Sequence, residues 1–215
     1  MAQSEIKFYW APGACSLCPH VLLFETGVSF KSIANLITKE TVEFTENFSF
    51  INPKMRVPVL SLEGEIITEV PAIATAISSL APELHLLGGT TMETIKVYEW
   101  MNWLSGTLHA HAFGGLLRPE RLSDEKEALP GIEKKGMRNA QNCFDMIEGK
   151  LNGFYAVGGA FTVVDSYLFV FYRWGEGYGL NMKSVYPKYT ALVENLVNRP
   201  SMQKVLELEK SQAKL

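Results

Sequence analysis

The chain has 215 residues, of which 47% are hydrophobic and 20% are charged, and its formal net charge at pH 7 is -3. This composition predicts an ordinary globular protein with one large core or two smaller ones. The slightly acidic balance, without a run of Lys or Arg, argues against nucleic acid or an anionic membrane as a partner. No apolar stretch approaches the roughly 20 residues of a membrane span, and residues 1–10 lack the features of a signal peptide, so we expect a cytoplasmic protein.

The first 83 residues alternate between strand-like and helix-like segments. Apolar, β-branched and aromatic runs predict strands over residues 6–10, 29–33, 57–60 and 66–67. Helices are expected over residues 16–26, 41–50 and 69–79. Glu63-Gly64-Glu65, between the last two strands, predicts a hairpin. The order β-α-β-α-β-β-α is typical of a thioredoxin-like domain, a small mixed sheet with helices on both faces.

From residue 90 to residue 215 the pattern predicts helices only. A long aromatic-rich helix is expected over residues 92–113, ending at Gly114-Gly115. Thr162-x-x-Asp165 resembles a capping box that opens an apolar helix. Further helices are expected over residues 132–151, 187–197 and 201–210. The fold class is therefore α/β followed by all-α, in two domains that cover residues 1–83 and 90–215.

Cys15 lies at the predicted start of the first helix, after the turn pair Pro12-Gly13. Free backbone N–H groups and the positive end of the helix dipole favour an anion there. A thiolate is therefore expected on Cys15 or on a thiol ligand docked against it. Cys18 follows at the spacing of a dithiol that cycles through a disulfide, and core packing is the other explanation for it.

The cysteines are otherwise unremarkable in number and spacing. Three is an odd count in a chain too large to need disulfides, so reduced thiols are expected. Cys143 falls on the apolar face of a predicted helix and is expected to pack in the core. Zinc would need four ligands, and Cys15, Cys18 and His20 lack a second pair at ligand spacing, so no metal is expected.

Two proline-containing segments are further candidates. Val57-Pro58 begins a predicted strand, where a cis bond would expose the N–H and C=O of Val57 to an extended peptide; an edge-strand proline is the alternative. Glu69, at a predicted helix start, can accept a ligand ammonium while the N–H of Val70 donates to a ligand carboxylate; a simple helix cap is equally compatible. Pro71 leaves this helix start one donor short.

The long helix carries a polar stripe and several aromatic residues. Asn102, Ser105 and His109 are spaced i, i+3 and i+7, so they share one face of an α-helix. In a cleft between domains such a His hydrogen-bonds an anion or shuttles a proton; a solvated face is the alternative. An apolar pocket or a helical core accounts for the aromatic set Trp100, Trp103, Phe113, Tyr172 and Trp174.

Five blocks in collinear order span nearly the whole chain: FYWAPGACSLCPHVLLFETG, NPKMRVPVL, IITEVPAI, EWMNWLSGTLH and GGAFTVVDSYLF. Together they resemble the glutathione S-transferases, most closely the cysteine-bearing beta class typical of bacteria. The resemblance implies a thioredoxin-like domain that binds glutathione, an all-helical domain that shapes a pocket for a hydrophobic electrophile, and a homodimer. Glutathione would be the co-substrate, without a metal.

The resemblance also implies roles for individual residues. Cys15 would face the glutathione sulfur, and Val57, before a cis-Pro58, would pair with the tripeptide backbone. Glu69, with Val70, would hold the γ-glutamyl end, and Asn102 and His109 would reach the site from the second domain.

Four departures from the family pattern bear on these roles. Relatives usually carry Ser or Gly and then a non-proline residue where this chain has Val70-Pro71, which weakens or rearranges the γ-glutamyl site. Arg56 stands where Gln or Lys is common and is able to clamp the glycyl carboxylate in bidentate fashion. The family's lysine after the second strand has only an offset counterpart, Lys39. Other classes place a catalytic tyrosine where Trp10 stands, and Ser16 is the reserve hydroxyl donor.

Three hypotheses follow. In the first, glutathione loses its thiol proton, hydrogen-bond donors from Cys15, Ser16 and His109 stabilise the thiolate, and the thiolate attacks an electrophilic carbon. The product is a conjugate, or an isomer if glutathione is eliminated again. In the second, Cys15 attacks a glutathione disulfide and Cys18 resolves it, which makes the protein a thiol-disulfide oxidoreductase. In the third, the chain binds glutathione or scaffolds without catalysis.

Overall fold

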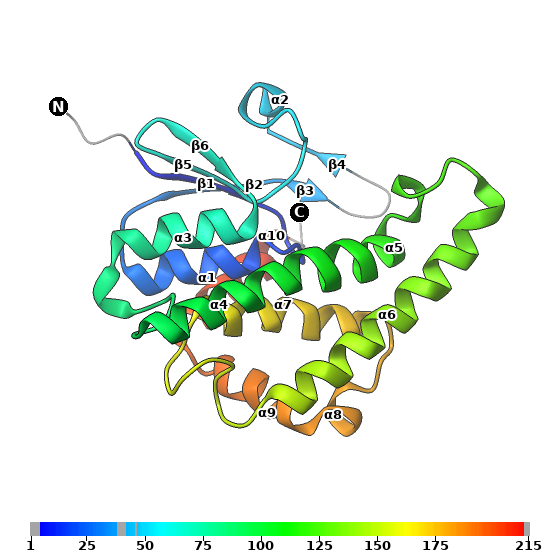
Figure 1. The fold of residues 1–215 in the computed structure, drawn as a ribbon. Coiled ribbons are helices and arrows are strands. Elements are labelled where there is room, and N and C mark those ends of the chain that lie inside the picture. Colours follow the sequence, from blue (N-terminus) through cyan, green and yellow to red (C-terminus); the bar gives the residue numbers. More distant parts are fainter. Residues whose placement is uncertain (1–4, 38–41, 46, 213–215) are drawn as a thin grey trace.

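The computed structural model describes residues 5–37, 42–45 and 47–212. The N-terminal part contains a four-stranded sheet in the order β2-β1-β5-β6, in which β1 pairs parallel with β2 and antiparallel with β5 (Figure 1). Its elements are β1 (Lys7–Trp10), α1 (Leu17–Thr26), β2 (Lys31–Ala34), β3 (Leu36–Ile37), β4 (Val42–Glu43), α2 (Phe48–Ile51), β5 (Val59–Leu62), β6 (Glu65–Thr68) and α3 (Val70–Leu80).

The two faces of this sheet are covered unequally. Alternation along β1 sends Phe8 and Trp10 into the main core, under α1 and α3, while Tyr9 points to the opposite face. On that face Tyr9 contacts Phe48 of the one-turn helix α2 and Val59. The predicted thioredoxin-like arrangement with helices on both faces is therefore confirmed, although the second face has only a single helical turn.

The segment after β2 differs from the prediction. A helix was expected over residues 41–50, but Val42–Glu43 form strand β4, which pairs antiparallel with β3, and the helix is limited to Phe48–Ile51. Val42 is β-branched and favours an extended backbone. Thr41 and Lys39 lie outside the described residues.

The hairpin predicted after β5 is confirmed. Glu63 and Gly64 both have positive φ, at 54° and 88°, as in a two-residue type I′ turn. This turn sets the register in which Leu62 pairs with Glu65 and Val59 with Thr68. It brings the end of β6, and Glu69 after it, beside the start of β5.

Helices make up the described part of the chain beyond Pro82. They are η1 (Pro82–Leu84), α4 (Thr91–Trp103), the π-helix η2 (Leu104–Phe113), α5 (Gly114–Leu117), η3 (Pro119–Arg121), η4 (Lys126–Ala128), α6 (Leu129–Lys150), α7 (Val163–Gly177), α8 (Met182–Val185), α9 (Pro187–Leu196) and α10 (Pro200–Gln212). Of the described residues, none lies in a helix long and apolar enough to cross a membrane.

The sequence predicted that the long helix ends at Gly114-Gly115. In the structure the helix continues through α5 to Leu117. The N–H of Gly114 donates to the carbonyl of His109, which carries the helical hydrogen bonding on. At Gly115 an added Cβ would lie 3.4 Å from the carbonyl oxygen of Ile132. These glycines allow close contact with α6 rather than ending the helix.

The predicted capping box at the start of α7 is confirmed. Asp165 Oδ2 accepts from the Thr162 N–H at 2.7 Å, and the Thr162 side chain accepts in return from the Asp165 N–H. Asp165 Oδ1 also accepts from the N–H of Ala156. The box begins α7, which packs against α1 (Figure 1).

Candidate functional site

A cavity of about 400 Å³, here called the inner cavity, lies where the ends of β5 and β6 face η2 and η3. It brings together most of the predicted site residues from four separate segments: Cys15, Arg56, Val57, Pro58, Glu69, Val70 and His109. Ser16 and Asn102 do not line it. We call the side formed by Cys15, Val57, Pro58, Glu69 and Val70 the sheet-side wall.

Val57 presents its backbone to the inner cavity. The Val57-Pro58 bond is cis, as expected, and β5 begins only at Val59, so the backbone of Val57 lies outside the strand pairing. The Cys15 Sγ lies 3.9 Å from the Val57 carbonyl oxygen. The sheet-side wall thus places the Val57 peptide, which is outside the strand pairing, next to a thiol that donates to its carbonyl oxygen.

Glu69 occupies the residue before α3 in an unusual backbone conformation. Its φ is 71° and ψ 127°, a region that residues other than glycine rarely adopt and that costs about 1–3 kcal/mol. Its carboxylate does not cap the helix, which rules out the simple-cap interpretation, and instead lies 2.5 Å from Lys54 Nζ. Both side chains are exposed at the cavity rim. The first turn of α3 lacks one N–H, because its second residue is Pro71.

Cys15 is a buried thiol rather than a thiolate. Burial raises its pKa to about 12, against a smaller lowering by its own backbone N–H. The helix α1 begins at Leu17, so Cys15 precedes the N-cap and gains little from the helix dipole. The expectation of a thiolate on Cys15 is therefore wrong. At neutral pH its S–H donates to the Val57 carbonyl oxygen and would have to turn away from it to reach an anion in the cavity.

The other two cysteines pack in the core. Cys18 is fully buried, with its Sγ 3.3 Å from Ser166 Oγ of α7, and burial raises its pKa strongly. Cys143 lies buried on α6, as predicted. Both are free thiols, as is Cys15. Among the described residues, no three His, Cys, Asp or Glu side chains gather in a way that would hold a metal.

Ser16 is not available as a hydroxyl donor. Its Oγ accepts from the N–H of Ala11 and donates to the carbonyl of the same residue, both at 3.1 Å. The side chain is fully buried and closes the turn before α1. The prediction that it reaches a ligand thiol is therefore wrong.

Opposite the sheet-side wall stands the helix-side wall, which we define as Ser105, His109, Arg118, Arg121 and Tyr167. Ser105 and His109 come from the π-helix η2, which is wider than an α-helix and common at functional sites. Because the π-helix changes the spacing, Asn102 does not share one helix face with Ser105 and His109, as α-helical spacing had predicted. Asn102, in the last turn of α4, is exposed and stays outside the cavity.

His109 is neutral at physiological pH. Burial and then the nearby Arg56 lower its pKa to about 4. Its ring packs edge-on against Trp174 and Phe171, at centroid distances of 5.1 and 5.9 Å, and its Nδ1 lies 3.5 Å from the Tyr167 hydroxyl. His109 is thus a hydrogen-bonding group rather than a strong base.

Sequence reasoning missed several residues of the helix-side wall. Tyr167, whose phenol has a pKa raised by burial well above 10, lies within the GGAFTVVDSYLF block, two residues after the capping Asp165. Arg118 and Arg121 flank η3, and their i, i+3 spacing just after a helix end was the signal available for them. Lys54, at the rim, gave no signal of its own.

A second cavity of about 440 Å³, the outer cavity, also borders Cys15. It shares Cys15, Arg56, Val57, His109, Arg118 and Arg121 with the inner cavity. Its remaining surface is mostly apolar and comes from Pro12, Gly13, Ala14, Phe44, Met55, Leu117 and Trp174.

Of the five aromatic residues proposed for a pocket, Trp174 alone lines the outer cavity as described. Phe113 and Tyr172 are buried in the helical core. Trp100 and Trp103 line a small groove between α4 and α6, where Lys150 Nζ lies 5.1 Å from the centre of the Trp100 ring. These four residues do not support the predicted pocket.

The turn before Cys15 is held by the far end of the chain. The buried Glu209 of α10 accepts from the N–H of Gly13 at 3.1 Å and pairs with Arg173 at 2.7 Å. Trp174 Nε1 donates to the Gly13 carbonyl at 2.8 Å. The N–H and the carbonyl of Gly13 are therefore both held by helices that are distant in sequence.

Comparisons with known proteins agree with this architecture. Residues 112–200 match the model of the glutathione S-transferase C-terminal domain. GstA, a glutathione S-transferase of Escherichia coli O157:H7, is 29% identical over 95% of this chain and 98% of its own length. A beta-class glutathione S-transferase of Sphingomonas chungbukensis is 32% identical, with a TM-score of 0.80, over 94% of this chain and 98% of its own.

A second solved structure, a sphingomonad glutathione S-transferase complexed with glutathione, is 30% identical with a TM-score of 0.80. The likeness covers 95% of this chain and 98% of that one. Sequence identities of 30% and 32% along almost the entire chain show a shared family as well as a shared fold. The chain belongs to the glutathione S-transferase family and resembles its bacterial beta class.

Proposed function

We propose that glutathione binds in the inner cavity and that its thiolate attacks a hydrophobic electrophile held in the outer cavity. The observation that carries this proposal is the meeting of Cys15, Val57, Glu69 and His109, from four distant segments, around one cavity. The solved sphingomonad relative contains glutathione. The proposed division into residues 1–83 and 90–215 makes the cleft between the two domains the reaction site.

The inner cavity offers a partner for each part of an extended glutathione. The Glu69 carboxylate suits the γ-glutamyl ammonium, and the N–H of Val70 suits the γ-glutamyl carboxylate. The Val57 backbone suits the cysteinyl amide in the manner of an added strand. Arg56 is placed to take the glycyl carboxylate. Ser16 and Asn102 have no part in this arrangement.

Activation of the thiol requires donors rather than a base. Lowering a thiol pKa from about 8.5 to about 6.5 requires about 2.7 kcal/mol of preference for the thiolate. A hydrogen bond to a charged group contributes about 1.5–3 kcal/mol. The neutral Cys15 thiol and the neutral His109 ring are the donors that we propose for it. Since the pKa of His109 is about 4, the thiol proton goes to solvent.

The thiolate then forms a C–S bond to the electrophilic carbon. With an aryl halide the halide leaves with its electron pair, and the product is a conjugate. With a conjugated double bond, the thiolate adds, the carbon chain rotates, and the thiolate leaves again, which isomerises the bond. Proximity of the two cavities supplies much of the acceleration in either reaction.

Disulfide chemistry is the less favoured alternative. A thiol with a pKa near 12 is a poor nucleophile at neutral pH, and Cys18 faces Ser166 in the core rather than Cys15's cavity. The named relatives are transferases. These observations support glutathione transfer over a thiol-disulfide oxidoreductase.

Rates with an activated aryl chloride and with glutathione disulfide test this choice, in the wild type and in Cys15→Ala. We expect conjugation in both proteins, slower in the variant by about tenfold for the loss of one donor, and no disulfide reduction in either. Disulfide reduction that disappears in Cys15→Ala would favour the redox enzyme. Calorimetry that detects no glutathione binding at millimolar concentration would favour a non-catalytic module.

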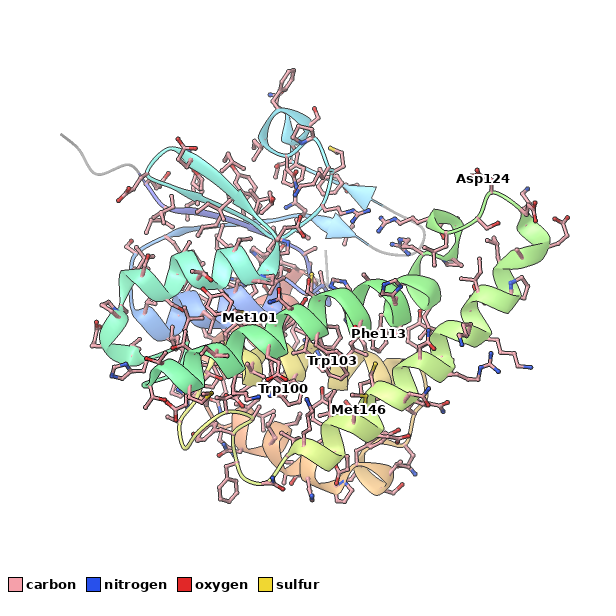
Figure 2. The ribbon with its side chains drawn as sticks, in the orientation of Figure 1. Trp100, Met101, Trp103, Phe113, Asp124 and Met146 are labelled. Carbon is pink, nitrogen blue, oxygen red and sulfur yellow. The ribbon has the colours of Figure 1, made fainter. Side chains whose placement is uncertain are left out.

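We also propose that the protein is a cytoplasmic homodimer. Two features support a second copy as partner: Phe50 of α2 is 87% exposed, and the α4–α6 groove is lined by Trp100, Trp103 and Met146 (Figure 2). Exposed aromatic side chains and apolar grooves are typical of contact surfaces. Sedimentation velocity measures the assembly state.

A further inference from the structure

A third cavity, of about 530 Å³, lies beyond the outer cavity. The lining residues that these two cavities have in common are Gly13, Ala14, Leu117 and Trp174. The outer cavity also shares residues with the inner one, whereas no described residue lines both the inner and the third cavity. The three cavities therefore follow one another in a row, with the outer cavity in the middle.

The surface of the third cavity is mostly apolar. Its apolar side chains include Leu17, Leu117, Val170 and Trp174. Arg173 is the one charged side chain among its described lining residues, and its guanidinium lies 2.7 Å from the carboxylate of the buried Glu209. The Tyr178 hydroxyl donates to the Leu116 carbonyl. A cavity whose polar groups are already paired suits an uncharged aromatic or aliphatic group.

Trp174 separates the outer cavity from the third one. Trp174 and Gly13 line both cavities, and Trp174 Nε1 donates to the Gly13 carbonyl at 2.8 Å. This hydrogen bond joins α7 to the turn before Cys15. Because the bonded pair borders both cavities, the indole and the Gly13 peptide form the partition between them.

Both partners of this hydrogen bond are held in place. The indole packs against the rings of His109, Phe113 and Phe171, at centroid distances of 5.1, 5.1 and 5.4 Å. The N–H of Gly13 is held by Glu209 at 3.1 Å. The partition is thus fixed from both sides, and a molecule in the outer cavity meets it as a wall.

The row of cavities orients an electrophile. Under the proposed function the glutathione sulfur lies beside Cys15, on the side that the outer cavity shares with the inner one. An aromatic ring in the outer cavity presents its reacting carbon to that side. A substituent para to the reacting carbon therefore extends away from the sulfur, toward Trp174.

We propose that Trp174 determines the length of the electrophile: the wild type accepts a single-ring aromatic electrophile, and removal of the indole admits a second ring into the third cavity. This inference rests on the proposed function, because the outer cavity has to be the electrophile site. Trp174 does not line the inner cavity, so its role concerns the electrophile and not glutathione.

A matched pair of ketones tests the proposal. 4-Chloro-3-nitroacetophenone and 4-chloro-3-nitrobenzophenone differ by a phenyl in place of a methyl group, para to the chloride. With either ketone the glutathione thiolate forms a C–S bond and chloride leaves with its electron pair. For each, kcat/KM at saturating glutathione is divided by the uncatalysed rate constant at the same pH. We expect the wild type to favour the single-ring ketone about tenfold, as for overpacking against a fixed wall.

Substitutions of the indole should reverse this preference. In Trp174→Ala we expect the two-ring ketone to be favoured about tenfold, because its second ring becomes buried in the third cavity. Trp174→Phe keeps a ring against His109 and loses the donor to Gly13, so an intermediate ratio is expected. The KM for glutathione should stay within about twofold of wild type in both variants. Trp174→Phe also answers the question if Trp174→Ala does not fold.

A double variant shows where the second ring lies. Gly177 lines the third cavity but not the outer one, and a Cβ added there meets no described atom within 4 Å. Gly177→Leu, added to Trp174→Ala, should fill the third cavity and restore the preference for the single-ring ketone. The control is Gly131→Leu in the same background, at an exposed position of α6 that lines none of the three cavities. There the preference of Trp174→Ala is expected to remain.

The results that would overturn the proposal can be told apart. Equal normalised rates for the two ketones in the wild type, or one ratio in all Trp174 variants, remove the length limit and leave glutathione transfer intact. If Gly177→Leu does not reverse the preference of Trp174→Ala, the second ring does not occupy the third cavity. Transfer to neither ketone in the wild type overturns the proposed function, and this inference with it.

Discussion

The sheet-side wall of the inner cavity combines the backbone groups of Val57 and Val70 with the side chains of Cys15 and Glu69, whereas the helix-side wall presents side chains. Val57 precedes β5 and Val70 begins α3, so their peptide groups are fixed by the sheet and the helix start. His109 and Arg121 come from a π-helix and a 3-10 turn. Backbone groups suit a constant peptide ligand. Side chains on irregular helices can be replaced without disturbing the sheet, so substrate choice is expected to reside there.

The largest effect is expected on the sheet-side wall, from Glu69→Gln. Loss of the carboxylate that we assign to the γ-glutamyl ammonium should raise the KM for glutathione about 10- to 100-fold, with kcat little changed. Calorimetric titration with glutathione gives the same comparison at equilibrium. Glu65→Gln, an exposed glutamate at the start of β6, is the matched control. A KM within about twofold of wild type would contradict the role of Glu69.

A smaller effect is expected from Gly136→Ala, which acts on the support of the helix-side wall. An added Cβ would lie 2.8 Å from the Ala112 carbonyl oxygen of η2, so backbone has to shift. We expect a loss of about 1–3 kcal/mol in the free energy of unfolding, measured by urea denaturation. Because η2 carries His109, kcat should fall while the KM for glutathione stays.

The same helix supplies the control for that variant. At Gly149 of α6 an added Cβ meets nothing within 4 Å among the described atoms. Gly149→Ala should therefore stabilise the protein by about 0.5–1 kcal/mol, through helix propensity alone. If both alanine variants were equally stable, close packing of α6 against η2 would not be what shapes this wall.

The smallest effect on the free energy of unfolding at neutral pH is expected at His20, which supports the sheet-side wall. His20 of α1 is enclosed by aromatic rings, including that of Trp10 at 4.8 Å, and burial lowers its pKa to about 3 from an ordinary 6.5. The folded state thus needs the neutral ring. Its contribution to stability is complete above pH 6.5 and is lost as the pH falls toward 3.

His20→Phe removes this titration. Relative to wild type, the variant should gain about 1.4 kcal/mol in unfolding free energy for each pH unit below about 6.5. Urea denaturation at about pH 5.5 and about pH 7 measures the difference. His109 titrates in both proteins, so its contribution to the pH dependence cancels in the comparison. Exposed His85, changed to Phe, is the control, and the same pH dependence in all three proteins would contradict a neutral buried His20.

The sequence predicted the sheet-side wall better than the helix-side wall, for a physical reason. Turn chemistry is local, so Val57-Pro58 and the turn pair Pro12-Gly13 before Cys15 could be recognised within a few residues. The stripe of Asn102, Ser105 and His109 assumed α-helical spacing, and the π-helix broke it between the first residue and the other two.

The state of Cys15 was also beyond local reasoning. Its position after a turn predicted a stabilised thiolate, but burial decides its pKa. The segments that enclose it lie far along the chain: Val57 contacts it directly, and Trp174 and Glu209 hold the turn before it. Non-local packing of this kind has no periodic signal in a sequence.

The contact between Gly13 and Glu209 has a consequence for biosynthesis. The two residues are 196 positions apart, and a ribosome that adds about 5–20 residues per second needs about 10–40 s to make that stretch. The turn before Cys15 is therefore translated well before the α10 residue that accepts from its N–H, and this turn reaches its final hydrogen bonding only after the helical part has been made.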